Sequence, residues 1–282
     1  MKCKLRASVT AVAVVLVVSS AALAQIRKEY RYTVGPHAAV VVNNQYGPIS
    51  VTAAPGNQII VNANQQSDKV EIDQSQNGDR IDIVTHLLSG ASVENARVDY
   101  QLQVPAGANL TLHSSTGPLH ADGMRGDVTL EGAQADVQVR DVSDAHVHVR
   151  TLSGPITLTN INQGHVEITS IQGNVTLEEV SGPLVQVNCT SGRILYDGDF
   201  GSGGQYSLMT HSGDIDATVP GYAAIDVSAR SIKGEVKNDL PLQPKHTPFP
   251  PGTNTFAGKL GSAVSSVKLF SFSGKIHLRK KQ

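Results

Sequence analysis

Five short phrases decide the fold of this 282-residue chain, and each places Gly before alternating apolar residues. They read "STGPLHA" (115–121), "LSGPITL" (152–158), "IQGNVTL" (171–177), "TSGRILY" (190–196) and "HSGDIDA" (211–217). The anchor residues of the series recur 18, 19, 19, 19, 21 and 21 positions apart, at Gly117, Ala135, Gly154, Gly173, Gly192, Gly213 and Gly234. A weaker set lies between them, at Gly126, Ala145, Gly164 and Gly182. Because a fixed period of this length is typical of stacked-repeat proteins, we predict a unit of about 19 residues made of two half-units.

Apolar residues occupy the second and fourth positions after each anchor, so one face of every short strand points inward. The pairs are Leu119 and Ala121, Val137 and Val139, Ile156 and Leu158, Val175 and Leu177, Ile194 and Tyr196, Ile215 and Ala217, and in the half-units Val128 and Leu130, Val147 and Val149, Val166 and Ile168. One unit cannot bury that face alone, but units stacked about 4.8 Å apart can. With no Trp and 4% aromatic residues, the composition also favours strands and turns. We therefore predict an all-β, parallel β-helix or β-roll-like solenoid.

The first 24 residues have the pattern of a signal peptide. Lys2, Lys4 and Arg6 precede the apolar run 11–18, and Ala22-Leu23-Ala24 fits a small-x-small cleavage site. The apolar run is short for a membrane span, although an uncleaved anchor is the alternative. We expect export, with Gln25 at the mature N-terminus and no transmembrane span in the mature chain.

The rest of the chain, 25–282, is predicted to form a single β-solenoid domain. Irregular first coils are expected over 25–112, regular coils over 113–238, a Pro-rich exposed loop over 239–262 and closing strands over 263–280. Asn77-Gly78, between two alternating segments, predicts a β-hairpin. The basic run at 279–281 is interpreted as a solubilising tail that blunts a sheet edge.

Charge and cysteine content exclude two classes of protein. Without the signal peptide the chain has 20 basic and 24 acidic residues, a formal charge of 20 − 24 = −4. We interpret these charged residues as dispersed along the sequence. This argues against a nucleic-acid partner. Cys189 would be the one cysteine of the mature chain, which excludes an intrachain disulfide. Its phase with Val185 and Val187 predicts a small buried residue rather than a reactive thiol.

The order of these features resembles the DUF4097 family of exported bacterial domains labelled adhesins, which is related to the head-GIN domains. The resemblance lies in residues 98–132, in the series of Ser/Thr-Gly phrases, and in the closing "VKLFSFSGKIHLRK" (267–280). It implies a right-handed parallel β-helix-like fold at the cell envelope. It offers no catalytic residues to transfer to this chain.

Catalytic motifs are absent from the sequence, so no catalytic residue and no cofactor is predicted. The serines before Gly, such as Ser153 and Ser191, recur at the repeat period and are therefore turn residues. Carbohydrate-active enzymes on β-helices use clustered carboxylates. Four such residues are close in sequence, at Asp127, Asp136, Asp141 and Asp144, but they are expected at turns or on the outer face, without aromatic residues on which a sugar could stack.

One polar cluster follows from the repeat register. If a rung is 19 residues long, His146 lies beside His165, and His148 beside Glu167. Three imidazoles and a carboxylate are the ligand types that zinc prefers. These four residues are the candidate metal site, with a solvated polar ladder as the alternative interpretation.

The sequence thus predicts an exported, non-catalytic envelope or surface module, adhesin-like, whose partner is an unidentified protein or glycan. Two alternatives remain at this point: a metal- or ligand-sensing periplasmic domain, and a carbohydrate-active enzyme on a β-helix. The predicted location is periplasmic, cell-surface or extracellular in a bacterium.

Overall fold

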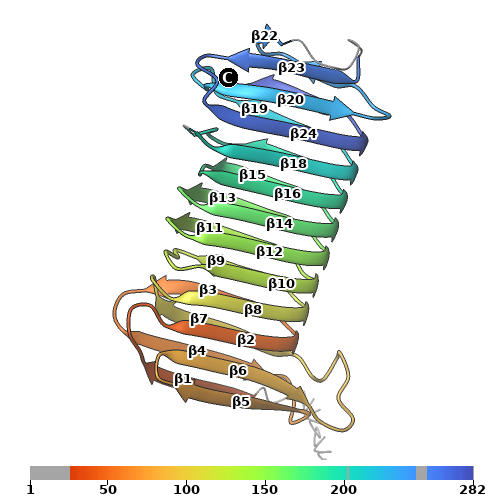
Figure 1. The fold of residues 1–282 in the computed structure, drawn as a ribbon. Helices are drawn as coiled ribbons and strands as arrows, with labels where there is room; N and C mark the ends of the chain where they lie inside the picture. Colours follow the sequence, from red (N-terminus) through yellow and green to blue (C-terminus); the bar gives the residue numbers. More distant parts are fainter. Residues whose placement is uncertain (1–25, 202, 246–252, 282) are drawn as a thin grey trace, which may run out of the picture.

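A computed structural model describes residues 26–201, 203–245 and 253–281, and every regular element in these ranges is a β-strand. The strands form one 12-stranded and one 13-stranded sheet that face each other along an elongated stack (Figure 1). This confirms the predicted all-β, solenoid-like architecture. The predicted signal peptide, 1–24, lies outside the described residues. Among the described residues no helix has the length and hydropathy needed to cross a membrane.

The strand bounds follow the order of each sheet. The 12-stranded sheet contains β1 (Ile26–Thr33), β4 (Gln58–Gln65), β7 (Val98–Pro105), β3 (Ile49–Ala54), β9 (Leu119–Asp122), β11 (Val137–Ser143), β13 (Ile156–Asn162), β15 (Val175–Val180), β17 (Ile194–Asp197), β19 (Ile215–Val219), β25 (Ile276–Lys280) and β21 (Val236–Asn238). The 13-stranded sheet contains β22 (Gln243–Pro244), β23 (Thr255–Leu260), β20 (Ile225–Ser231), β24 (Ser265–Ser273), β18 (Gln205–Ser212), β16 (Leu184–Ser191), β14 (His165–Gln172), β12 (His146–Ser153), β10 (Val128–Gln134), β8 (Asn109–Thr116), β2 (Ala39–Tyr46), β6 (Arg80–Leu87) and β5 (Val70–Asn77).

From β8 to β19 consecutive strands alternate between the two sheets, so each pair of strands makes one rung. Val128 pairs in parallel with Val147, Val147 with Val166, and Val166 with Val185, each step being 19 residues (147 − 128 = 19). The next step, from Val185 to Tyr206, is longer by two residues (206 − 185 = 21). Residues at the same position of the repeat therefore lie above one another in the stack. The inward positions predicted from the anchors are all buried.

Glycine is required at the corners where adjacent rungs approach most closely. Gly173 has φ +141°, and a Cβ built on it would lie 2.1 Å from the carbonyl oxygen of Gly154 on the preceding rung. Residues with a Cβ are disfavoured at this backbone conformation, and the distance excludes an added carbon. The repeated Gly of the sequence phrases is therefore a requirement of stacking.

An aromatic cluster fills the core where the rungs become longer. The rings of Tyr196, Phe200 and Tyr206 have centroids 4.8, 4.9 and 5.9 Å apart. The Tyr196 hydroxyl donates to the carbonyl oxygen of Val180 at 2.8 Å, and the Tyr206 hydroxyl to that of Gly182 at 2.9 Å. Rings need more space than the Val and Leu columns of the preceding rungs, and the longer connection between β17 and β18 supplies Phe200 to that space.

The N-terminal end differs from the irregular coils expected over 25–112. Val40 of β2 pairs in parallel with Leu110, and Ile49 of β3 with Leu119, so this segment is a regular rung. Antiparallel strands close the end: β1 and β7 flank β4, and β5 pairs with β6. The β5–β6 hairpin, with Gly78 at φ +61°, confirms the turn predicted at Asn77-Gly78.

At the C-terminal end, the prediction of a loop over 239–262 is wrong for Thr255–Leu260, because these residues form β23. This strand pairs antiparallel with β20 and covers that edge of the sheet, and the two-residue β22 pairs with it. The Lys245 N–H extends this pairing by donating to the carbonyl oxygen of Ala257 at 3.0 Å, and residues 246–252 lie outside the description. The basic run 279–281 lies beyond β21, whose pairing with β25 ends at Leu278, so Arg279 and Lys280 pair with β19 but with no other described strand. This agrees with the sheet-edge position expected for the run, although β25 as a whole lies between β19 and β21.

Candidate functional site

The four residues of the predicted metal site come together on the outer face of the 13-stranded sheet. His146 is in register with His165, and His148 with Glu167, on the adjacent strands β12 and β14. The two imidazole rings of His146 and His165 stack with centroids 4.6 Å apart and planes 8° apart. His148 Nδ1 lies 3.6 Å from Glu167 Oε2. The two pairs expected from the 19-residue register are therefore adjacent in the structure.

Stacking nevertheless gives these imidazoles a poor geometry for sharing one ion. The nitrogen lone pair of an imidazole lies in the ring plane, so two nearly parallel rings direct their lone pairs side by side. A zinc ion needs them to converge at about 2.0–2.1 Å from each nitrogen. Within the described ranges no group of three or more His, Cys, Asp or Glu side chains is placed to hold a metal ion. The metal site requires a ring rotation and stays a prediction.

Three of the four clustered aspartates have local roles in the structure. Asp127 Oδ1 accepts a hydrogen bond from the backbone N–H of His146 at 2.9 Å. Asp141 and Asp144 adopt left-handed backbone conformations, with φ of 53° and 56°. Asp141 also accepts a hydrogen bond from the Asn160 side chain one rung away. These contacts are those of turn residues that join one rung to the next.

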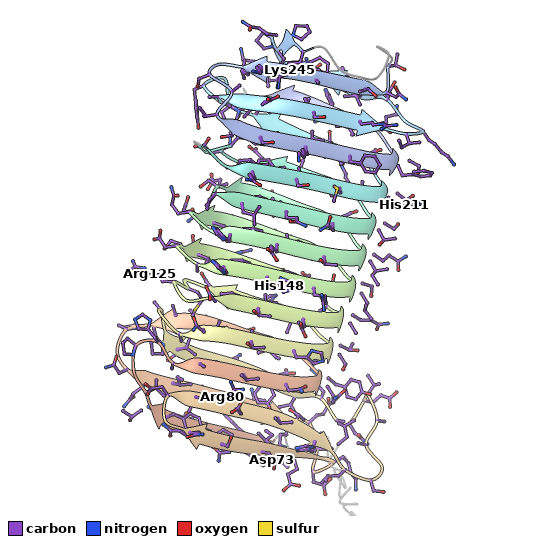
Figure 2. The ribbon with its side chains drawn as sticks, viewed as in Figure 1. Asp73, Arg80, Arg125, His148, His211 and Lys245 are labelled. Atoms are coloured by element: carbon purple, nitrogen blue, oxygen red, sulfur yellow. The ribbon has the colours of Figure 1, made fainter. Side chains whose placement is uncertain are left out.

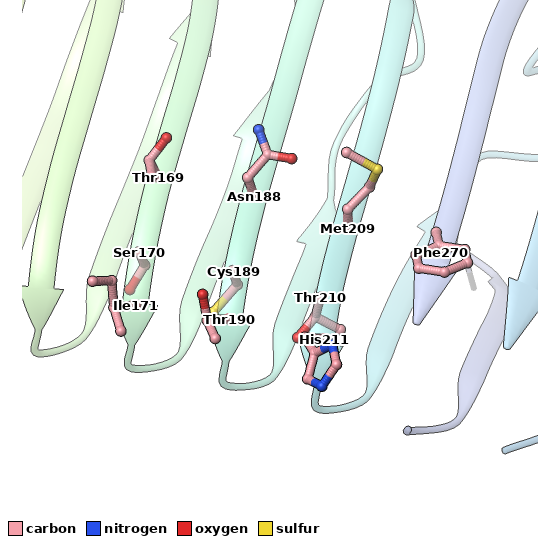
Figure 3. Close-up of a pocket in the computed structure, with 10 residues that line it drawn as sticks. All are labelled: Thr169, Ser170, Ile171, Asn188, Cys189, Thr190, Met209, Thr210, His211 and Phe270. Atoms are coloured by element: carbon pink, nitrogen blue, oxygen red, sulfur yellow. The ribbon is translucent and has the colours of Figure 1, made fainter. Parts of the chain in front are cut away.

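A shallow groove, which the sequence reasoning missed, lies on the same outer face towards the C-terminal end (Figure 3). It has a volume of about 300 Å³ and crosses the four neighbouring strands β14, β16, β18 and β24. Its lining residues are Thr169, Ser170, Ile171, Asn188, Cys189, Thr190, Met209, Thr210, His211 and Phe270. The lining thus combines apolar side chains with hydroxyl and amide groups, and contains no Lys, Arg, Asp or Glu.

Large apolar side chains are exposed in and beside this groove. Ile171 is 50% exposed and Met209 38% exposed, and Met209 is in register with Phe270. At the rim the rings of His211 and Phe272 stack with centroids 4.7 Å apart, and Lys233 Nζ lies 4.9 Å from the Phe272 centroid. Covering these side chains with a partner is favourable because it removes apolar surface from water.

Cys189 lies in the floor of the groove but has the features of a structural thiol. It is free and buried, and its Sγ lies 3.6 Å from the carbonyl oxygen of Gly173. Burial raises the pKa of the thiol, which reduces the thiolate fraction that a nucleophile needs. The buried position predicted from its phase with Val185 and Val187 is confirmed.

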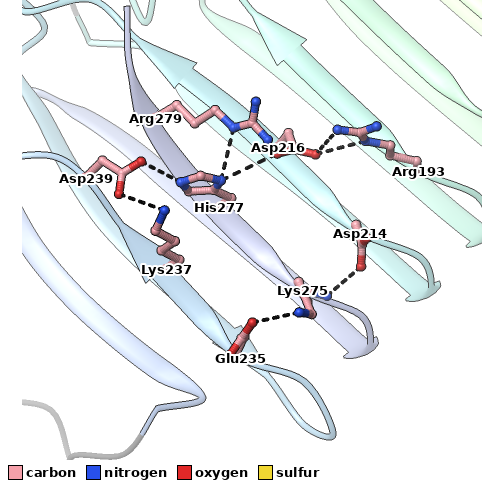
Figure 4. Close-up of polar contacts among 9 residues, drawn as sticks. All are labelled: Arg193, Asp214, Asp216, Glu235, Lys237, Asp239, Lys275, His277 and Arg279. Atoms are coloured by element: carbon pink, nitrogen blue, oxygen red, sulfur yellow. Dashed lines mark hydrogen bonds and ion pairs between the residues drawn. The ribbon is translucent and has the colours of Figure 1, made fainter.

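A charge network on the 12-stranded sheet is a second feature that the sequence reasoning missed (Figure 4). Asp216, whose side chain is 7% exposed, accepts from Arg193 at 2.5 Å and from Arg279 at 2.6 Å. It thereby links the corner before β17 to β19 and β25. His277 Nε2 lies 2.6 Å from Asp239 Oδ2, and this hydrogen bond is the main cause of a lowered pKa of the Asp239 carboxyl. The network fastens the closing strand β25 to the stack, which is a structural role.

Comparison with known proteins gives one informative match. A family model described as Toastrack DUF4097 matches residues 37–279. No curated protein matches the chain. A solved structure described as a "putative adhesin" from Parabacteroides distasonis is 10% identical, with a TM-score of 0.46 over 92% of this chain and 98% of that one. A second one so described, from Bacteroides fragilis, is 12% identical, with a TM-score of 0.43 over 90% of this chain and 97% of that one.

Proposed function

Because the chain belongs to the Toastrack DUF4097 family, we propose that it is an exported, non-catalytic β-solenoid of the bacterial cell envelope that binds a partner as an adhesin does. The domain extends over 25–282. We further propose that its coils, of about 19 residues, are right-handed, as the resemblance implies and as most crossovers between parallel strands are. The proposal of export rests on the signal-peptide pattern of residues 1–24.

The groove on the 13-stranded sheet is the observation that carries the binding proposal. It crosses four strands whose backbones are fixed by parallel pairing on both sides. A partner therefore meets a preformed surface and little conformational entropy is lost on binding. Because the lining has no Lys, Arg, Asp or Glu, it suits an uncharged segment of an envelope protein or glycan. The Thr169, Asn188 and Thr190 side chains supply the polar contacts.

The test is a capture experiment with the chain from Gln25 onward, immobilised and exposed to an extract of the cell envelope. We expect one protein or glycan to be retained reproducibly by the folded chain and not by the same chain after thermal unfolding. In parallel, the soluble chain is incubated with a panel of envelope polysaccharides. Cleavage of any of them would overturn the non-catalytic proposal in favour of a carbohydrate-active enzyme.

A metal-sensing domain is the second candidate, favoured by the side-by-side placement of His146 and His165. If rotated rings bind zinc, zinc should raise the melting temperature of the wild type because the ion binds only the folded state. The His146→Ala, His165→Ala double variant should then lose the rise. A melting temperature that zinc leaves unchanged in the wild type would remove this candidate.

A further inference from the structure

Charge is strongly segregated along the stack, in contrast to the dispersed charge expected from the sequence. Residues 225–282 contain ten Lys and Arg and three Asp and Glu, a formal charge of 10 − 3 = +7. Residues 25–224 contain ten basic and 21 acidic residues, a charge of 10 − 21 = −11. All strands of the basic segment, β20 to β25, lie at one end of the stack (Figure 1). The molecule is therefore an acidic body with a basic end.

The basic end presents cations that neighbouring carboxylates do not neutralise. Lys259, Lys268 and Lys280 are exposed, and none of them forms an ion pair with a described residue. Others, such as Lys275 with Glu235 at 2.9 Å, are paired. In Figure 2, Lys245 marks this end, while Arg125 lies along the acidic body. Unpaired cations at one end make a surface that attracts anions over about the Debye length, ~8–10 Å at ordinary salt.

Exposed apolar side chains lie at the same end. Tyr222, in the β19–β20 connection, is 77% exposed, and Val264, in the β23–β24 connection, is 51% exposed. The two connections are in contact, since Ser265 N–H donates to the carbonyl oxygen of Ala224 at 3.0 Å. Both residues line the same depression, together with Ala223, Ala224 and Ser262 and with Asp199, Phe200 and Gly201 of the β17–β18 connection, so one carboxylate, Asp199, lies beside them. A tyrosine side chain suits the headgroup region of a lipid surface because its ring is apolar and its hydroxyl can remain hydrated.

We propose that this end of the stack docks on an anionic phospholipid surface. Lysine side chains attract the headgroup phosphates, and Tyr222 and Val264 enter the interface between headgroups and acyl chains. A polyanion dissolved in water would satisfy the charge but would give these two side chains no apolar environment. The acidic body is repelled by the same surface, so the stack stands on its basic end. Both outer faces, including the groove, then remain free, although the inference does not depend on the groove.

The test measures co-sedimentation of the chain from Gln25 onward, which contains every described strand, with lipid vesicles. Starting at Gln25 removes Lys2, Lys4, Arg6 and the apolar run, which would bind vesicles by themselves. We expect binding to vesicles of phosphatidylglycerol mixed with phosphatidylcholine, and none to phosphatidylcholine alone. Raising the salt to about 1 M, where the Debye length falls to about 3 Å, should release most of the protein. Equal binding to both kinds of vesicle would contradict the proposal.

Two triple variants with the same change in net charge locate the docking surface. Lys259→Gln, Lys268→Gln, Lys280→Gln removes three unpaired cations from the basic end and should weaken vesicle binding about tenfold or more. Arg125→Gln, Arg140→Gln, Arg150→Gln removes three exposed cations from the acidic body and should leave binding within about twofold. Both sets lie on the surface, and thermal melting of each variant checks that it folds. Equal losses in the two variants would overturn the assignment of the basic end.

The apolar contribution distinguishes a lipid surface from other anionic partners. Tyr222→Ser, Val264→Ser leaves the charge unchanged and should reduce vesicle binding several-fold. It should not change retention on immobilised polyphosphate, a soluble polyanion that lacks an apolar phase. If the variant binds vesicles as the wild type does while the lysine triple variant loses polyphosphate and vesicles alike, the partner is a polyanion and the lipid proposal is wrong.

Discussion

Gly173→Ala is expected to lower the melting temperature by about 8–16 °C, an effect of roughly 4 kcal/mol on the free energy of unfolding for a chain of this length. The first cause is overpacking, since the new Cβ would lie 2.1 Å from the carbonyl oxygen of Gly154. Displacing packed atoms costs about 1–3 kcal/mol. The second is backbone strain at φ +141°, which adds about 1–3 kcal/mol for a residue with a Cβ.

Gly221→Ala is the matched control for this substitution. A Cβ at Gly221 would meet Lys280 Cε at 3.8 Å, an ordinary contact with the end of a flexible side chain. We expect a change within about 0.5 kcal/mol. Both variants are compared by thermal unfolding followed by far-ultraviolet circular dichroism. If they melt together, the corner glycines are not the stacking requirement that the structure assigns to them.

Tyr196→Ala is expected to destabilise the chain by about 3–5 kcal/mol, because it opens a cavity in the aromatic cluster. Tyr196 is fully buried, its ring packs against Phe200 and Tyr206, and its hydroxyl satisfies the carbonyl oxygen of Val180. Tyr222→Ala, at a side chain 77% exposed, is the control and should change stability by less than about 0.5 kcal/mol. Chemical denaturation of the two variants measures the difference. A loss at Tyr196 no larger than that at Tyr222 would contradict the cluster's role.

The same cluster gives stability a pH dependence in the alkaline range. Burial raises the pKa of Tyr206 to about 12 and that of Tyr196 well above 10.0. Because a folded-state pKa above the unfolded value favours the neutral phenol, this stabilisation is complete below pH 10 and is lost as the pH rises towards 12. Absorbance titration of the wild type and Tyr206→Phe should show one high-pH ionisation fewer in the variant.

The fold was predictable because the repeat carries its own geometry. A period of 19 residues with alternating apolar positions defines which side chains point inward and which residues stack. The adjacency of His146 and His165, and of His148 and Glu167, followed from that period alone. Register determines which residues are neighbours, but it does not determine ring orientation, so the stacking of the two imidazoles could not be derived from it.

The order of the rungs at both ends was not predictable from local pattern. The rung containing β3 lies between β7 and β9, and β24 lies between β18 and β20, so neighbours in the stack are distant in sequence. Contacts such as Arg279 with Asp216 depend on this order. The groove was missed because outward Ile171 and Met209 are single exposed residues in sequence and become a surface only across rungs. The basic end, in contrast, could have been found by counting charge over residues 225–282.

The central claim is that the outer face of the 13-stranded sheet binds a partner through the groove. The most direct measurement is the affinity of the captured partner for two double variants of the chain. Ile171→Ser, Met209→Ser alters the groove, whereas Leu88→Ser, Val93→Ser alters equally exposed apolar residues in the loop after β6. We predict that the groove variant loses about tenfold or more in affinity, as expected when apolar contacts of a binding surface are removed, and that the loop variant binds as the wild type does. Unchanged affinity in the groove variant, with both variants folded, would contradict the claim.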